Sequence, residues 1–239
     1  MVRRIGIIGG TSLVERAKGL ELERLEVETP FGHPSSPLHV GMWGEGEVAL
    51  LVRHGLDHDV PPHRLNHRAN VHALRSAGVK KLILVASAGS MREGIEPPTV
   101  VLVDDFSSPF TIPTFYDDEI GHIAPVLSDD MRSTLVVVAA EEGIPVLDGA
   151  VYVQTRGPRL ETRAEVRALK AWGDLLGMTV ASEATLAMEI GMEVAVICSV
   201  DNMAHGMGTE PLEFETIMAN AASNWKSIER LLRAAAGRL

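Results

Sequence analysis

Short runs of aliphatic residues recur along this chain, and turn residues or helical patterns separate them. The runs cover Ile5 to Ile8, Val48 to Val52, Leu82 to Ala86, Val100 to Val103, Val151 to Val153 and Val194 to Ser199. They are rich in β-branched residues and do not alternate strictly with polar ones. This pattern predicts strands that are buried on both faces of a sheet.

Helical patterns lie between several of these runs. In residues 65–77, Leu65, Ala69 and Leu74 recur near helical spacing, and Gly78 follows as a stop signal. Similar patterns cover residues 129–142, 161–172, 182–190 and 211–236. Strands that alternate with helices predict an α/β sheet covered on both faces. Because 239 residues fit one large domain of this class, we expect a single domain over residues 1–239.

The stretch from Asp104 to Pro125 departs from this alternation. It contains Pro109, Pro113 and the acidic residues 117–119, which together predict a long irregular excursion at the surface. Loops of this length often border active sites, and an inert surface loop is about as common. The aromatic residues of the excursion would be suited to reach a neighbouring subunit.

Charge and cysteine content restrict the function classes. The chain carries 22 Lys and Arg against 32 Asp and Glu, a formal charge of −10, which opposes binding to nucleic acid or to an anionic membrane. A small anionic ligand would therefore need a local pocket of donors. The single cysteine, Cys198, lies in an apolar run, and no segment approaches the roughly 20 apolar residues of a membrane span. We expect a cytoplasmic protein.

Glycines and polar residues follow three of the expected strands. The first strand ends in GGTSL (residues 9–13), the second in VRHG (52–55) and the third in ASAGS (86–90). Glycine allows a backbone to approach a ligand closely, and an arginine fork matches the oxygens of an oxyanion. Taken singly, each feature is also typical of a tight turn or of a surface pair. Together they favour one anion site at the edge of the sheet.

Several longer segments give a more specific signal. They are IGIIGGTSL, TPFGHPSSPLHVG, VRHGLDHDVPPHRLNHRANVHALRSAGV, ASAGSMRE, QTRGPRLETRAE, GMTVASEATLAMEIGM and SVDNMAHG, and they cover nearly the whole chain. In this order they resemble the purine nucleoside phosphorylase family, and more narrowly its branch that acts on 5′-methylthionucleosides. The resemblance implies one α/β/α domain around a mixed sheet that curls towards a barrel, assembled as a homotrimer. It also implies a purine nucleoside and inorganic phosphate as co-substrates, with no further cofactor.

The resemblance assigns roles to residues where the motifs match. It implies phosphate binding by Thr11, Arg53, His54 and Thr179 and by the backbone around Ala86 and Ser87. It places Met178 under the ribose and Asn202 at the purine, so that His54 and Asn202 act in catalysis. Physical chemistry agrees, because cleavage of the N-glycosidic bond builds positive charge on the sugar and negative charge on the base. The spacing of His54, His58, His63, His67 and His72 also invites a metal, but no companion motif accompanies it, and we expect none.

The expected purine preference follows from one difference between this chain and adenine-specific members of the family that it resembles. Adenine-specific relatives carry two aspartates, separated by one residue, where this chain has Asn202 and Ala204. A carboxamide tolerates a 6-oxo group, which predicts 5′-methylthioinosine, or inosine and guanosine, as substrate. A shift by one residue would instead bring Asp201 to the base and restore S-methyl-5′-thioadenosine. Leu160, Met207 and Met218 are candidates for a 5′-methylthio pocket, and His205 for a contact to a 5′-hydroxyl.

Two rival functions remain open at this point. A hydrolytic nucleosidase of the same fold would use water in place of phosphate, and it would need no anion cradle. A non-catalytic purine-binding protein could keep the same scaffold, because fold alone does not determine function.

Overall fold

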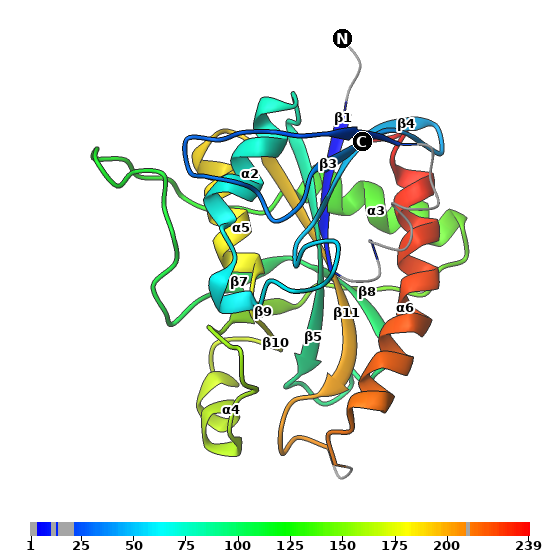
Figure 1. Cartoon of the computed structure of the whole chain (residues 1–239). Helices are drawn as coiled ribbons and strands as arrows, with labels where there is room; N and C mark the ends of the chain where they lie inside the picture. The colour runs from blue at the N-terminus through cyan, green and yellow to red at the C-terminus, as the bar shows by residue number, and fades with distance from the viewer. Residues whose placement is uncertain (1–3, 11–12, 14–21, 209–210) are drawn as a thin grey trace.

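The computed structural model describes residues 4–10, 13, 22–208 and 211–239. Eleven strands of these ranges form one sheet. They are β1 (Arg4–Gly9), β2 (Glu23–Leu25), β3 (Leu38–Trp43), β4 (Gly46–Val52), β5 (Lys81–Ser90), β6 (Thr99–Val103), β7 (Asp105–Ser107), β8 (Leu147–Asp148), β9 (Val151–Gln154), β10 (Leu175–Gly177) and β11 (Glu193–Met203). Figure 1 shows β5 and β11 running side by side through the centre of the molecule.

The sheet is mixed and it branches at β5. One path runs β2-β3-β4-β1-β5-β10-β9-β7, while β11 pairs with β5 on its other edge and leads on to β6 and β8. The pairs of β1 with β4 and β5 and of β5 with β11 are parallel, whereas β10 is antiparallel to β5 and β6 is antiparallel to β11. The described strands do not close into a barrel.

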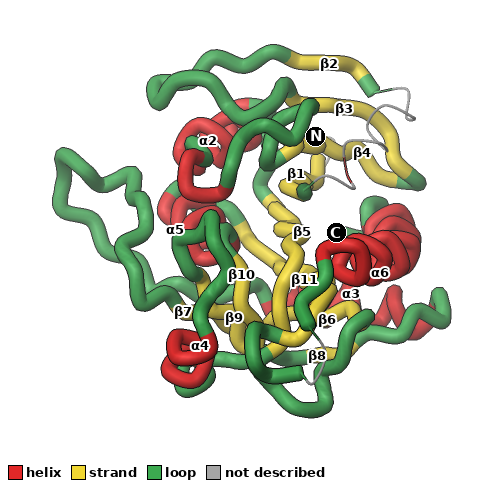
Figure 2. Tube along the Cα trace, turned by 60° about the horizontal axis from the view of Figure 1, so that its bottom comes forward, coloured by secondary structure: helices red, strands yellow, loops and turns green. Residues whose placement is uncertain are grey.

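Helices cover both faces of this sheet. α2 (His67–Ser76) and α5 (Val180–Glu189) pack together on one face, and α3 (Asp129–Glu141) and α6 (Phe214–Ala235) pack on the other (Figures 1 and 2). The short η1 (Pro62–Arg64) precedes α2, and α4 (Arg163–Leu169) lies near the carboxyl ends of β5 and β11. Within the described ranges, no helix is long and apolar enough to cross a membrane.

The strands are buried on both faces because their side chains alternate between two cores. On β5, Leu82 and Leu84 belong to the core under α2 and α5, whereas Ile83 and Val85 belong to the core under α3 and α6. This is the reason why the sequence shows continuous aliphatic runs instead of an alternating pattern. The same alternation continues to Ser87, whose side chain therefore faces α6.

The structure confirms the α/β/α architecture expected from the sequence. Each of the six aliphatic runs forms a strand and each of the five helical patterns forms a helix. The strands that the sequence did not predict are β2, β3, β7, β8 and β10. The excursion from Asp104 to Pro125 is irregular after β7, as expected. Glu189 anchors it, because its carboxylate accepts hydrogen bonds from Thr114 Oγ1 and from the Phe115 backbone N–H.

Candidate active site

The branch at β5 leaves an opening in the sheet. β1 pairs with β5 only as far as Leu84, and β10 begins to pair with the same edge of β5 at Gly89. Between these points, the edge of β5 has no strand beside it in the described chain. Arg53, which follows β4, extends its side chain into this region and donates from Nη1 to the Val85 carbonyl at 2.9 Å.

Arg53 is held in the opening by a buried carboxylate. Its Nε and Nη2 donate to the two oxygens of Glu183, in the first turn of α5, at 2.7 and 2.8 Å, and Nη2 lies 3.5 Å from the Ile8 carbonyl. Both side chains are almost inaccessible to water. Burial alone raises the pKa of the Glu183 carboxyl, but its interactions with Arg53 and with His67, whose Nδ1 lies 3.7 Å from Oε1, outweigh burial and hold this pKa at about 2.

The backbone of Ser87 faces the same opening. Val85 directs its carbonyl to this edge of β5, and Met91 directs its N–H there, donating to the Asp174 carbonyl at 2.7 Å. Because backbone groups alternate between the two edges of a strand, the N–H and carbonyl of Ser87 point to this edge as well. Ala86 is buried and lies opposite Cys198 of β11, so by the same alternation its backbone groups point to β11. The opening therefore combines a guanidinium with a backbone donor.

His54 borders the opening on the side of the β1 turn. Its Nδ1 lies 2.8 Å from the Val60 carbonyl, and the Val60 N–H donates back to the His54 carbonyl at 3.0 Å. A Cβ added to Gly10 would lie 4.0 Å from Cδ2 of the ring, so the Cδ2 edge of the ring faces Gly10. Burial and the neighbouring charge of Arg53 lower the pKa of His54 below 6.5. Thr11, the hydroxyl expected in that turn, lies outside the described residues.

Thr179 and Met178 lie at the start of α5. Thr179 is buried, and its backbone N–H donates to the Tyr152 hydroxyl at 3.4 Å. Met178 packs against Gly157, where an added Cβ would meet the Met178 sulfur at 2.4 Å. Met178 therefore joins the start of α5 to the loop that leads into α4.

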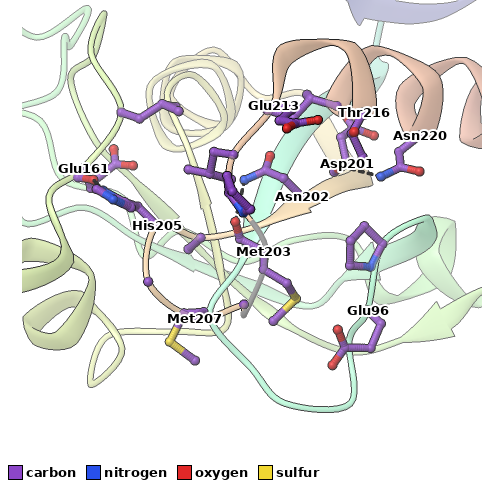
Figure 3. Close-up of a pocket in the computed structure, with 18 of the residues that line it drawn as sticks. Glu96, Glu161, Asp201, Asn202, Met203, His205, Met207, Glu213, Thr216 and Asn220 are labelled. Atoms are coloured by element: carbon purple, nitrogen blue, oxygen red, sulfur yellow. Dashed lines mark hydrogen bonds between the residues drawn. The ribbon is translucent and has the colours of Figure 1, made fainter.

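A pocket of about 1140 Å³ opens at the carboxyl ends of β5 and β11, between α6 and the loop before α4. Of the residues expected at the nucleoside, Asn202, Ala204 and Leu160 line it, together with Met207. Figure 3 shows Asn202 between Glu161 and His205 on one side and the start of α6 on the other. Met178 and the residues expected at the phosphate are not part of this lining, and neither is Met218.

A β-bulge sets the position of Asn202. The register between β11 and β5 shifts between Val200 and Asn202, so Asp201 is the extra residue. The Asp201 carboxylate is inaccessible and accepts hydrogen bonds from Ser87 Oγ, Ser199 Oγ and, at 3.3 Å, Asn224 Nδ2. Burial raises the pKa of Asp201, and these hydrogen bonds oppose the rise. Asn202 donates from Nδ2 to the Met203 carbonyl at 2.8 Å, which leaves Oδ1 and a second N–H for a ligand.

Sequence reasoning missed two acidic residues of the site. Glu161 directly follows Leu160 in the QTRGPRLETRAE segment and lines the pocket, where Thr155 Oγ1 donates to its carboxylate at 2.5 Å. Because Glu161 follows an expected pocket residue, the sequence could have predicted it as a residue of the site. For Glu183 the sequence gives weaker evidence, which is a single carboxylate among the apolar residues of α5. Its contact to Arg53 joins positions 130 apart, which no local pattern reveals.

The fold and these two features define an α/β protein in which an arginine-lined opening in the sheet lies near a pocket at the carboxyl ends of β5 and β11. The chain belongs to the phosphorylase superfamily, whose family model matches residues 4–236.

Relatives along the full chain carry related names. The chain is 40% identical to a probable 6-oxopurine nucleoside phosphorylase of Archaeoglobus fulgidus, covering 97% of this chain and 95% of that protein. It is 33% identical to a probable S-methyl-5′-thioinosine phosphorylase of Thermodesulfovibrio yellowstonii, covering 96% and 89%. It is also 33% identical to an S-methyl-5′-thioadenosine phosphorylase of Pyrococcus abyssi, covering 97% and 91%.

A solved structure has the same fold. The methylthioadenosine phosphorylase of Schistosoma mansoni in complex with adenine superposes with a TM-score of 0.87 at 26% identity, covering 99% of this chain and 91% of the other.

Proposed function

We propose that this protein is a purine nucleoside phosphorylase, which uses inorganic phosphate to release a purine base and leave a sugar 1-phosphate. One observation carries the proposal. The Ser87 hydroxyl donates to Asp201, and this bond joins the opening that holds Arg53 to the bulge that presents Asn202. A nucleoside in the pocket and an oxyanion in the opening would therefore meet across β5.

The reaction needs positioning and electrostatics more than covalent help from the protein. An oxygen of hydrogen phosphate forms a bond to C1′ while the C1′–N9 bond breaks, and the bonding electrons pass to the purine. The proton that hydrogen phosphate loses as it becomes the sugar 1-phosphate balances the proton that the purine takes up at N7. The described hydrogen bonds use four of the five Arg53 donors, which leaves one Nη1 N–H for phosphate beside the Ser87 N–H. Asn202 Oδ1 accepts from N7–H as negative charge develops on the base.

The pocket chemistry favours a 6-oxopurine. The second N–H of Asn202 matches an O6 acceptor, whereas adenine presents an amino group there. Glu161 can accept from the N1–H of a 6-oxopurine, a proton that adenine lacks. Asp201, the alternative base-facing carboxylate, is already engaged by two hydroxyls and an amide. S-methyl-5′-thioadenosine therefore ranks second.

The sugar substituent decides between two substrate classes. Leu160 and Met207 give the pocket an apolar side that suits a 5′-methylthio group, while His205 offers a partner for a 5′-hydroxyl. The substrate is 5′-methylthioinosine on the first reading, and inosine or guanosine on the second. In either case phosphate is a co-substrate and no cofactor or metal takes part. We further propose a homotrimer that works in the cytoplasm.

Initial rates test the proposal. Methylthioinosine, methylthioadenosine and inosine are compared side by side, with and without phosphate. We expect phosphate-dependent release of base, fastest for a 6-oxopurine. Faster cleavage of methylthioadenosine would overturn the base assignment, and equal rates without phosphate would indicate a nucleosidase. Purine binding with no release of base would indicate a non-catalytic protein.

A variant tests the base assignment directly. Asn202→Asp should shift the preference towards 6-aminopurines, because a carboxylate accepts from the 6-amino group and repels O6. The same substrates are compared for Glu161→Gln. This variant should cleave 6-oxopurine nucleosides more slowly, and so lose its preference for them, without gaining activity on adenine nucleosides.

A further inference from the structure

The hydrogen bonding of His54 fixes which of its nitrogens carries the proton. Nδ1 lies 2.8 Å from the Val60 carbonyl, which can only accept, so Nδ1 is the protonated nitrogen. The return bond from the Val60 N–H to the His54 carbonyl clamps the two residues together. Rotation of the ring would break the first of these bonds. In the neutral ring, Nε2 therefore offers a lone pair and no hydrogen.

The surroundings of His54 keep the ring neutral near pH 7. Burial and the charge of Arg53 lower its pKa, the His58 ring 5.1 Å away acts in the same direction, and the Val60 hydrogen bond and the more distant Glu183 oppose the shift. The Cδ2 edge, to which Nε2 belongs, faces Gly10 in the turn after β1. An anion bound between Gly10 and Arg53 would thus meet an acceptor.

We propose that His54 makes this site selective for oxyanions that carry a proton, such as hydrogen phosphate, over those that carry none. This inference rests on the proposed function and adds a specificity rule to it. The P–OH group of hydrogen phosphate can donate to Nε2. Sulfate has no hydrogen to donate, so its oxygen and Nε2 would place two lone pairs against each other.

Charge alone cannot supply this discrimination. Hydrogen phosphate and sulfate both carry two negative charges near neutral pH, and the positive charge of Arg53 is already compensated by Glu183. Selection therefore depends on the pattern of donors and acceptors. Sites built around one hydrogen bond to a ligand hydroxyl reject analogues without it strongly.

Competing anions test the inference. Inhibition by sulfate and by monofluorophosphate, which has fluorine in place of the hydroxyl, is measured against phosphate in the cleavage assay, and binding of each anion is measured by calorimetry. We expect both to bind at least about tenfold more weakly than phosphate at pH 7.5. Sulfate affinity should rise as the pH falls through the lowered pKa of His54, because the protonated ring gains an Nε2–H donor.

Two variants complete the experiment. His54→Gln should reduce the difference in binding affinity between phosphate and sulfate, since a carboxamide can turn its N–H towards either anion. It should also remove the pH dependence of sulfate binding. His63→Gln, at an exposed histidine in η1, is the matched control and should keep both properties. Sulfate binding as tight as phosphate in the unaltered protein, or an unchanged difference in affinity in His54→Gln, overturns the inference. Failure of phosphate-dependent cleavage overturns the proposed function instead, and calorimetry still measures the selectivity.

Discussion

Arg53 and Glu183 depend on each other because both charges are buried. Arg53→Met would leave the Glu183 carboxylate without its main counter-charge, and Glu183→Leu would leave the guanidinium without its main acceptor. Each single substitution should lower the free energy of unfolding by about 3–5 kcal/mol, and the double variant should lose less than either. Urea denaturation of the three variants measures this. Losses that simply add in the double variant would show that the two groups act independently.

The pKa of Glu183 gives the same pair a pH signature. Its value of about 2, below the ordinary 4.5, means that its contribution to stability is complete above pH 4.5 and is lost as the pH falls from 4.5 towards 2. The full contribution is about 3 kcal/mol, from about 1.4 kcal/mol per pKa unit. Unfolding free energies measured between pH 5 and 3 should fall more steeply for the unaltered protein than for Glu183→Gln. Equal slopes would contradict a depressed pKa at this carboxyl.

The sequence predicts functional side chains better than it predicts their partners. Arg53 and Asn202 follow aliphatic runs, so their place at strand ends can be deduced from periodicity. Whether Asp201 or Asn202 enters the pocket could not be deduced, because it depends on a bulge in the pairing of β11 with β5. A bulge inserts one residue without any strong local signal, and every later side chain changes face.

The junction between β10 and α5 shows how tightly packed elements position Thr179. A Cβ added to Gly177 would lie 1.9 Å from the Tyr152 hydroxyl and 2.5 Å from Cζ of the same ring. The Tyr152 hydroxyl also accepts a hydrogen bond from the Thr179 N–H, so this side chain contacts both Gly177 at the end of β10 and Thr179 at the start of α5. The sequence did not predict β10, since three residues are too few to show a period.

Gly177→Ala tests this junction. The added methyl group should force β10 away from β9, lower the free energy of unfolding by about 1–3 kcal/mol and reduce phosphate-dependent cleavage. Gly10→Ala is the stability control, because the one described atom that its Cβ would meet is His54 Cδ2, at an ordinary 4.0 Å. Thermal and urea unfolding of both variants compare them. A Gly177→Ala protein as stable as the control would show that the junction is looser than this packing indicates.

At the scale of the whole molecule, the periodic parts of the sequence predicted the layers of helices and sheet. For the excursion from Asp104 to Pro125, which has no period, the sequence predicted only that the segment is irregular. Of the aromatic residues expected to reach a neighbour, Phe115 and Tyr116 also contact α5 of the same chain, where the Phe115 N–H and the Tyr116 hydroxyl donate to Glu189. Phe110 remains 50% exposed, and Ile120 is 94% exposed. Figure 1 shows the excursion extending away from the body of the molecule on the side of α5. Exposed apolar groups on such an extension favour a subunit contact.

This placement makes the proposed trimer testable. Light scattering should give a mass about three times 25.8 kDa for the unaltered protein. The double variant Phe110→Asp, Ile120→Asp should dissociate towards 25.8 kDa while keeping its fold, because charges at a subunit contact lose their hydration. Val137→Asp, at a 46% exposed position on α3, is the matched control and should leave the mass unchanged. If the unaltered protein is a fully active monomer, the trimer is refuted. If only Val137→Asp dissociates it, the contact lies over α3 and the excursion serves another purpose.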